Sequence, residues 1–113
     1  MQEKIRKYLQ AHSIKLMDKI DILKMQNADT DLIELIERLR NICSISVLNL
    51  DDIADIELQN IRDVLALCDK MLEDQENIEK YFIPMNEILN KLEDFYRTKK
   101  ILLDDKNKMS KVA

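Results

Sequence analysis

The chain has 113 residues, a formal net charge of −4 and 35% charged residues, which suits one domain with a core of its own. It contains no glycine and one proline, so glycine-rich phosphate-binding loops are excluded and tight β-hairpin turns are not expected. Hydrophobic residues make up 46% of the chain, which excludes disorder by composition.

The first predicted helix covers residues 2–26. Its apolar face repeats every three or four residues, as on a helix that packs against a core. The face contains Ile5, Leu9, His12, Leu16, Ile20 and Leu23, and Tyr8, Met17 and Met25 broaden it. Residues 26–30 then break the pattern with asparagine and aspartate, where other proteins use glycine. The spacing of Asp31 and Glu34 predicts a capping box at the start of the next helix.

The second predicted helix begins near Leu32 and carries apolar residues on one face as far as Cys43. Residues 44–48 alternate polar and β-branched side chains as a strand would, and we interpret them as a continuation of the helix. Apolar residues then surround the helix, whereas one face of a bundle covers only about a third to a half of that circumference. We therefore expect Ile45 and Leu48 to remain outside the core and to contact a partner.

The third predicted helix runs between residues 51 and 82, as one helix or as two in tandem. Asn49 or Asp51 is expected to cap it, and it is expected to end within residues 73–77, where no strongly apolar residue occurs. Its apolar positions follow the alternating steps of three and four residues that are typical of helices packed lengthwise, as in a coiled coil. They are Ile61, Val64, Cys68, Met71, Ile78 and Phe82.

Pro84 marks the start of the last predicted helix, because proline lacks an N–H group and favours an extended conformation at Ile83. The inward-facing residues of this helix are Met85, Ile88, Leu89, Leu92, Phe95, Tyr96 and Leu102. Acidic and basic residues four apart predict ion pairs on the outer faces of the helices. These pairs are Glu34–Arg38, Glu87–Lys91 and Glu93–Arg97.

The four amphipathic segments predict an all-α fold, an antiparallel four-helix bundle in up-down-up-down order. The alternative is an elongated helical hairpin that a partner chain completes. Residues 1–103 are expected to form this single domain, and residues 104–113 a mobile polar tail with little to bury. The net charge is +3 over residues 1–28, −9 over 29–80 and +2 over 81–113, which favours docking of the terminal helices on the central ones.

The sequence also bears on location. The longest uncharged run, residues 41–50, is too short to cross a bilayer, which takes about 20 apolar residues. The charged N-terminal segment is unlike a signal peptide. Cys43 and Cys68 lie among apolar neighbours without the spacing of a metal or redox motif, so we expect reduced thiols in the core. A cytoplasmic, reducing location without membrane contact is therefore predicted.

Residues 11–15, with the sequence Ala-His-Ser-Ile-Lys, are similar to the phosphorylation segment of histidine phosphotransfer domains, which are four-helix bundles with an Ala-His-x-x-Lys-Gly pattern. The resemblance implies that His12 accepts a phosphoryl group and that Lys15 helps to neutralise it. Leu16 stands where that family has glycine. A histidine in an apolar helix face also fits a packing role.

No other pattern predicts a catalytic, cofactor or metal site, and the lysines of residues 99–111 are not interleaved with the aromatic residues of a nucleic-acid surface. We therefore predict a non-enzymatic helical module that binds another protein, either a different chain or itself. Such modules include complex subunits, adaptors, chaperones, inhibitors and immunity-type proteins. The predicted partner-binding residues are Ile42, Ile45, Val47, Leu48, Tyr81 and Phe82. The alternative is a histidine phosphotransfer bundle that uses His12 and Lys15.

Overall fold

The computed structural model describes residues 2–99, and the regular secondary structure over that range is entirely helical. The elements are α1 (Gln2–Met25), α2 (Thr30–Leu48), η1 (Leu50–Asp52), α3 (Asp55–Glu73), η2 (Gln75–Tyr81) and α4 (Phe82–Thr98), where η marks a short 3₁₀-helix. The predicted all-α fold is confirmed. The predicted tail, residues 104–113, and the predicted core residue Leu102 lie outside the described residues.

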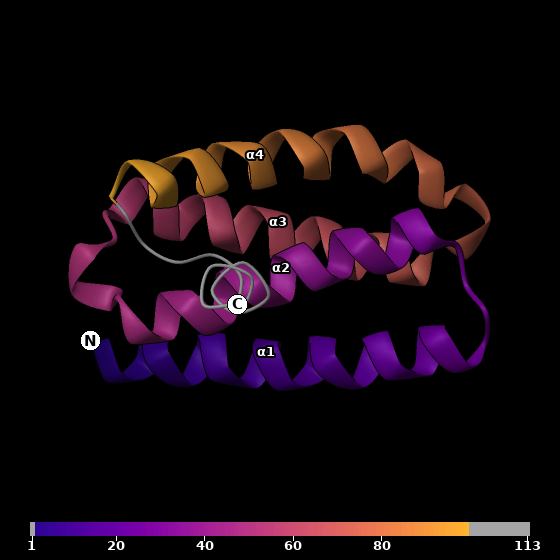
Figure 1. Ribbon diagram of the computed structural model, residues 1–113, viewed down its shortest axis with the longest axis horizontal. Coiled ribbons are helices and arrows are strands. Elements are labelled where there is room, and N and C mark those ends of the chain that lie inside the picture. Colours follow the sequence, from indigo (N-terminus) through magenta and orange to yellow (C-terminus); the bar gives the residue numbers. More distant parts are fainter. Residues whose placement is uncertain (1, 100–113) are drawn as a thin grey trace, which may run out of the picture.

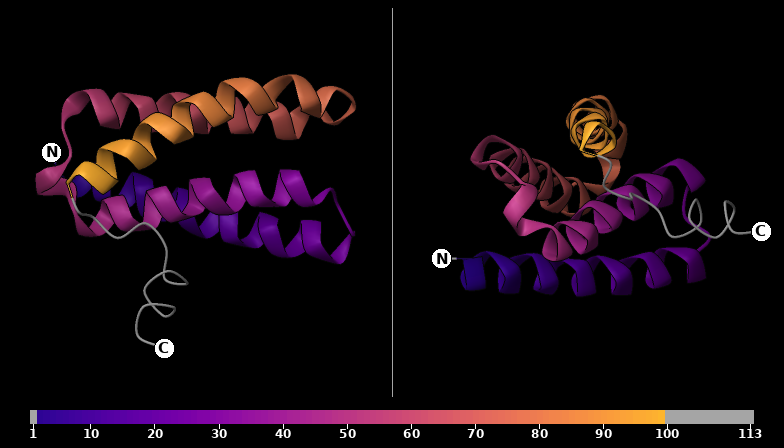
Figure 2. Two further views of the ribbon diagram at one scale, coloured as in Figure 1. Left: turned by 45° about the horizontal axis from the view of Figure 1, so that its top comes forward. Right: turned by 60° about the vertical axis from the view of Figure 1, so that its left-hand side comes forward.

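The four α-helices form two antiparallel hairpins, α1 with α2 and α3 with α4 (Figure 1). Helix α2 contacts each of the other three helices, so it joins the two hairpins. In the right-hand view of Figure 2, α4 is seen almost end-on while α1 still lies lengthwise, so the hairpins cross rather than run parallel. The chain therefore forms a compact bundle by itself rather than the elongated hairpin that its sequence also allowed.

The core contains buried side chains from every α-helix, and most of the predicted inward positions are confirmed. Fully buried examples are Leu9, Ile36, Leu39, Ile61, Leu65, Leu89, Leu92 and Tyr96. Three predicted positions of α1 are wrong, because Tyr8, Met17 and Met25 are 37%, 49% and 83% exposed. Met17 directly follows the buried Leu16, so it lies about 100° around the helix from it, outside the inward stripe.

The turn between α1 and α2 is built without glycine, as predicted. Asn27 has a φ of 55°, and asparagine tolerates this left-handed conformation better than most residues. The predicted capping box at Asp31 and Glu34 is wrong: the N-cap is Asp29, whose side chain accepts a hydrogen bond of 2.8 Å from the backbone N–H of Asp31. Helix α2 therefore begins at Thr30, and Asp31 lies within its first turn instead of capping it.

Helix α2 continues to Leu48, so the helical interpretation of residues 44–48 is confirmed. The predicted cap of α3 is wrong, because η1 intervenes and α3 begins only at Asp55. Asn49 instead closes α2: its Nδ2 donates a hydrogen bond of 2.8 Å to the carbonyl oxygen of Ile45. The burial of Leu50 and Ile53, each 8% exposed, accounts for this turn, because both side chains must reach the core within four residues.

Helix α3 ends at Glu73, inside the range predicted for its end, and η2 forms the extra turn before α4. Helix α4 begins at Phe82, so Pro84 lies in its first turn, where an N–H group would have no partner inside the helix. The expectation of an extended Ile83 is therefore wrong: this residue is helical. Pro84 limits how far α4 can extend toward η2, because a proline in the interior of a helix distorts that helix.

Candidate functional site

The six predicted partner-binding residues lie at different depths. Ile42 and Val47 are buried in the core, 1% and 8% exposed, and so offer little surface to a partner. Ile45 is half-buried and packs against the core, so it is neither a member of the buried core nor fully exposed. Tyr81 and Phe82 also pack against the core. Leu48, in contrast, is 81% exposed and remains a candidate contact residue.

Leu48 borders a shallow groove of about 480 Å³ between α1 and α2. We call the residues that line it the α1/α2 face: Gln10, Ser13, Ile14, Ser44, Val47 and Leu48. Ile14 is 63% exposed, so two large aliphatic side chains from different helices face solvent beside one groove. This pairing of exposed apolar residues distinguishes the face from singly exposed residues, which are normal on any surface.

Polar contacts hold the two helices together at the α1/α2 face. The hydroxyl oxygens of Ser13 and Ser44 are 2.6 Å apart and share a hydrogen bond between α1 and α2. Arg6 donates a hydrogen bond of 3.4 Å from Nη1 to the backbone oxygen of Val47, which fixes the end of α2 on α1. Ile14 and Leu48 line the same groove as these two serines.

Ile14 was not identified from the sequence, although a signal for it exists. The buried residues of α1 repeat at helical spacing, and Ile14 precedes the buried Leu16 by two residues. Two residues correspond to about 200° around an α-helix, so Ile14 lies nearly opposite the inward stripe. An isoleucine out of phase with its own helix face is the pattern that predicts an exposed apolar residue.

His12 and Lys15, the residues of the phosphotransfer alternative, line a second groove of about 240 Å³ between α1 and α3. The His12 ring lies 4.5 Å from the Tyr8 ring, centroid to centroid. Burial lowers the pKa of His12, and the carboxylate of Asp69 acts against this shift. Lys15 Nζ lies 3.5 Å from Asp69 Oδ1. A phosphoryl group on His12 would therefore share this groove with a carboxylate, and its lysine would already be paired.

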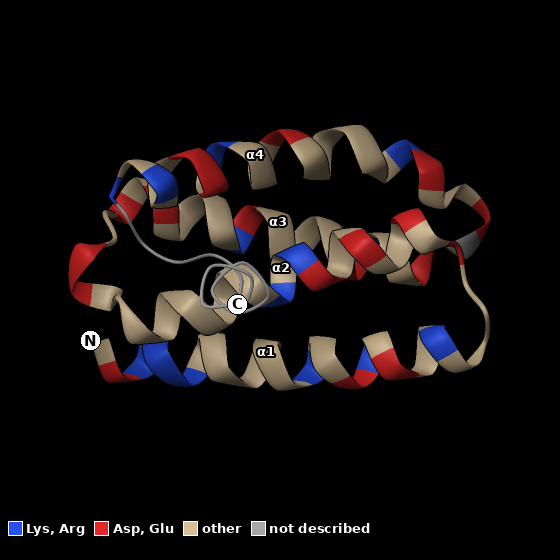
Figure 3. Ribbon diagram, viewed as in Figure 1, with Lys and Arg blue, Asp and Glu red and all other residues tan. Residues whose placement is uncertain are grey.

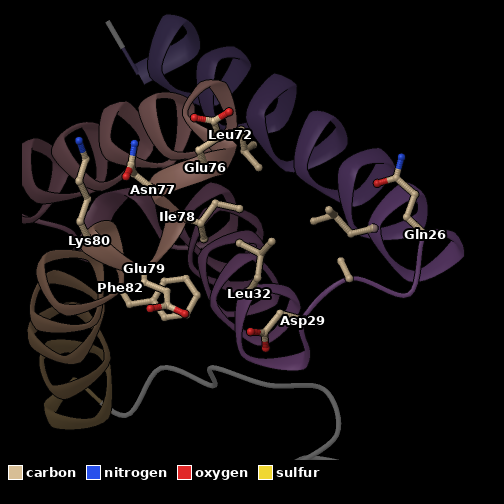
Figure 4. A pocket seen from close by; sticks show the side chains of 12 residues that line it. Gln26, Asp29, Leu32, Leu72, Glu76, Asn77, Ile78, Glu79, Lys80 and Phe82 are labelled. Carbon is tan, nitrogen blue, oxygen red and sulfur yellow. The ribbon is translucent and has the colours of Figure 1, made fainter.

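A third cavity, of about 530 Å³, lies at the other end of the bundle, between the α1–α2 turn and η2. Apolar residues such as Leu32, Leu72 and Ile78 line it together with polar residues such as Asn77 and Lys80 (Figure 4). It is open to solvent. The neighbouring Tyr81 hydroxyl donates a hydrogen bond of 3.3 Å to Asp74, so Tyr81 helps to hold η2 in place.

The two cysteines are free thiols in the core, as predicted. Burial raises the pKa of Cys43 and that of Cys68 to about 12. Because the thiolate is the reactive form, both are weak nucleophiles at neutral pH. Between residues 2 and 99, no three histidine, cysteine, aspartate or glutamate side chains gather so that they could hold a metal ion. None of the helices in the described part of the chain is both long enough and apolar enough to cross a membrane.

Figure 3 places charged residues along the outer sides of the helices and at the η1 turn. Ion pairs join α1 to its neighbours, as the charge segregation predicted: Lys24 Nζ lies 3.4 Å from Glu37 Oε2 on α2, and Lys15 pairs with Asp69 on α3. No protein-family model, curated protein or solved structure matches this chain.

Proposed function

We propose that this chain is a non-enzymatic helical module that binds another protein chain through the α1/α2 face. The observation that supports this proposal is the pair of exposed aliphatic side chains, Ile14 and Leu48, at 63% and 81% exposure beside one groove. Covering a large aliphatic side chain contributes roughly 1.5–3 kcal/mol. A partner that covers both residues therefore gains free energy from each of them.

The surroundings of the two residues fit a protein interface. Such surfaces usually combine apolar and polar residues, and here Gln10, Ser13 and Ser44 are the polar residues of the groove. A groove between two helices accepts the side chains of a third helix. The roles that fit are those of a complex subunit, adaptor, chaperone, inhibitor or immunity-type protein. We further propose a reducing, cytoplasmic location, because Cys43 and Cys68 are both free and buried.

The experiment is affinity capture from an extract of the native host, with the full chain and three variants as baits. Leu48→Asp places a charge on the α1/α2 face and should lose a stoichiometric partner that the wild type retains. Ile83→Asp is the matched control, because Ile83 is 71% exposed and lies on α4. It should capture that partner as the wild type does, and so should His12→Ala.

Two outcomes would contradict the proposal. One is a Leu48→Asp bait that keeps every partner, especially if Ile83→Asp loses one, because the contact surface would then lie at the start of α4. The other is acid-labile phosphate on His12 after incubation with a histidine kinase and a receiver domain, together with the absence of that phosphate from His12→Ala. That result would favour the phosphotransfer alternative.

A further inference from the structure

The outer side of α1 carries a regular stripe of exposed residues at alternating three- and four-residue steps. We call it the outer α1 stripe: Lys4, Lys7, Ala11, Ile14, Asp18 and Asp21. Figure 3 shows α1 along one edge of the bundle, with no other described element on that outer side. The stripe is basic at its N-terminal end, apolar in the middle and acidic at its C-terminal end. Ile14 belongs both to the stripe and to the α1/α2 face.

The charges of the stripe make no ion pair with any residue between 2 and 99. The ion pairs that α1 does make use other side chains, such as the pair between Arg6 and Glu3 and the pair between Lys15 and Asp69. Lys24, just beyond the stripe, pairs with Glu37. The stripe therefore presents two positive and two negative side chains outward in a fixed order.

We infer that the partner of this side is a second copy of the chain, bound antiparallel along α1 across a two-fold axis. This inference rests on the proposed function and names its partner. In the register that sets Ala11 opposite Ile14 of the second copy, the equal spacing sets Lys7 opposite Asp18 of that copy. In the same register Lys4 lies opposite Asp21. A two-fold axis repeats every contact, so all the charges of both stripes are paired with opposite charges.

The order of the charges selects this orientation. A parallel pair of α1 helices in register would set lysine against lysine and aspartate against aspartate, which like-charge repulsion disfavours. In the antiparallel pair, the apolar middle of each stripe meets that of the other copy. Leu48 borders Ile14 in the groove and so widens the apolar contact beyond α1.

The contact is narrow, so the dimer is expected to be weak. One helix pair falls at the low end of interface sizes, below about 1,200 Å² of total buried area. Exposed ion pairs contribute little each and are screened by salt. The dimer should therefore form with increasing protein concentration and dissociate when salt is added.

The test uses sedimentation velocity of the full chain over a series of protein concentrations. The wild type should shift from the mass of one chain toward that of two, and less so in high salt. Two variants change the stripe: K4E/K7E makes all four charged positions acidic, and D18K/D21K makes all four basic. Each variant alone should be monomeric, with association weakened on the order of tenfold or more. An equimolar mixture of the two should restore the dimer, because opposite charges again face each other at every position.

These substitutions lie at exposed positions, so circular dichroism should show unchanged helicity in both variants. A wild type that stays monomeric at the highest concentration would overturn the inference, and so would a mixture that stays monomeric. A dimer that persists in both separate variants would place the contact elsewhere.

The sedimentation and capture experiments together separate this inference from the proposed function. If the wild type is monomeric in sedimentation but the Leu48→Asp bait loses a partner that the wild-type bait captures, the dimer is wrong and the proposed function stands. A salt-sensitive dimer with capture unaffected by Leu48→Asp would support the dimer and contradict binding of a different chain.

Discussion

Tyr96 is the largest side chain that the core buries completely, and its hydroxyl group requires a partner there. Ser46, the buried polar residue of α2, supplies it, and the two hydroxyl groups share a hydrogen bond between α2 and α4. Ser46 Oγ also donates a hydrogen bond of 2.5 Å to the carbonyl oxygen of Ile42. Burial raises the pKa of Tyr96 to about 12, although the hydrogen bond between Tyr96 and Ser46 acts against it.

This raised pKa predicts a loss of stability at alkaline pH. Unfolded tyrosine ionises near 10.0 and folded Tyr96 near 12, so the contribution is complete below pH 10 and is lost as pH rises toward 12. Cys43 and Cys68 also make the protein less stable as pH rises, and their effect begins near pH 9.0, the ordinary pKa of a thiol. Each group changes the free energy of unfolding by up to about 1.4 kcal/mol per pH unit in its window.

The variant Tyr96→Phe isolates the tyrosine contribution. It should lose about 0.5–1.5 kcal/mol at neutral pH with the hydrogen bond to Ser46, whose hydroxyl keeps its bond to Ile42. Between pH 10 and 12 its stability should fall less steeply than that of the wild type. Urea unfolding at several pH values measures both effects. Equal slopes for the two proteins would show that Tyr96 does not ionise in this way.

The contact residues show what the sequence could and could not predict at the scale of single residues. Apolar side chains all around the end of α2 correctly predicted that some would be exposed, and Leu48 is. The phase of the preceding turns separates Leu48 from Ile42: Ile42 continues the face of Leu35 and Leu39, whereas Leu48, six residues later, lies about 240° further around the helix.

At the scale of elements, Arg38 of α2 joins this helix to α4. Its Nε and Nη2 donate hydrogen bonds of 3.1 and 2.7 Å to the two carboxylate oxygens of Glu93. Its Nη1 and Nη2 also donate to Asn86 and Asn90, at 2.6 and 2.9 Å. All three acceptors lie on one side of α4 because they are three or four residues apart. The predicted pairs Glu34–Arg38 and Glu93–Arg97 are therefore not the ones that form in the described structure.

Arg38→Ala should lower the free energy of unfolding by about 1.5–3 kcal/mol, because a bidentate, charge-assisted contact is lost and Glu93 is left without its cation. The side chains of Arg38 and Glu93 are 23% and 16% exposed, so solvent screens part of this effect. Arg38→Lys should recover only a part, because lysine cannot donate in the same forked geometry.

Arg97→Ala is the matched control. Arg97 pairs with Asp94 on the same helix at 2.8 Å, but the two side chains are 63% and 77% exposed. Its removal should change stability by less than about 1 kcal/mol. Urea unfolding followed by circular dichroism measures all three variants. Equal losses in Arg38→Ala and Arg97→Ala would contradict a specific contact between α2 and α4.

The elements differ in how far local sequence predicts them. The C-terminal ends of α1 and α3 followed from where the apolar periodicity stops, whereas residues 44–48 are helical although their own side chains alternate as in a strand. The caps did not follow from periodicity, because Asp29 and Asp31 are equally good acceptors and only the path of the turn decides between them. Arg38 shows the same limit, since its partners are more than 45 residues away in sequence.

At the scale of the whole molecule, the crossing of the two hairpins explains why one side of α1 is left uncovered. Helix α2 lies on the inner side of its hairpin and contacts α1, α3 and α4, whereas α1 lies at an edge of the bundle (Figure 1). The bundle therefore buries the inward stripe of α1 and leaves Ile14 and Leu48 outside. Sequence periodicity predicted four helices, but it could not predict which of them would lie at the edge.

Methyl NMR of the isotope-labelled chain tests the central claim most directly. The protein captured by the wild type, or more of the unlabelled chain itself, is added to the labelled chain in steps. We predict the largest shifts at the methyl groups of Ile14 and Leu48, which stand on the α1/α2 face. Ile56 and Ile83, 68% and 71% exposed on α3 and α4, should stay unchanged. Shifts concentrated at Ile56 or Ile83, with Ile14 and Leu48 unmoved, would contradict the assignment of the α1/α2 face as the contact surface.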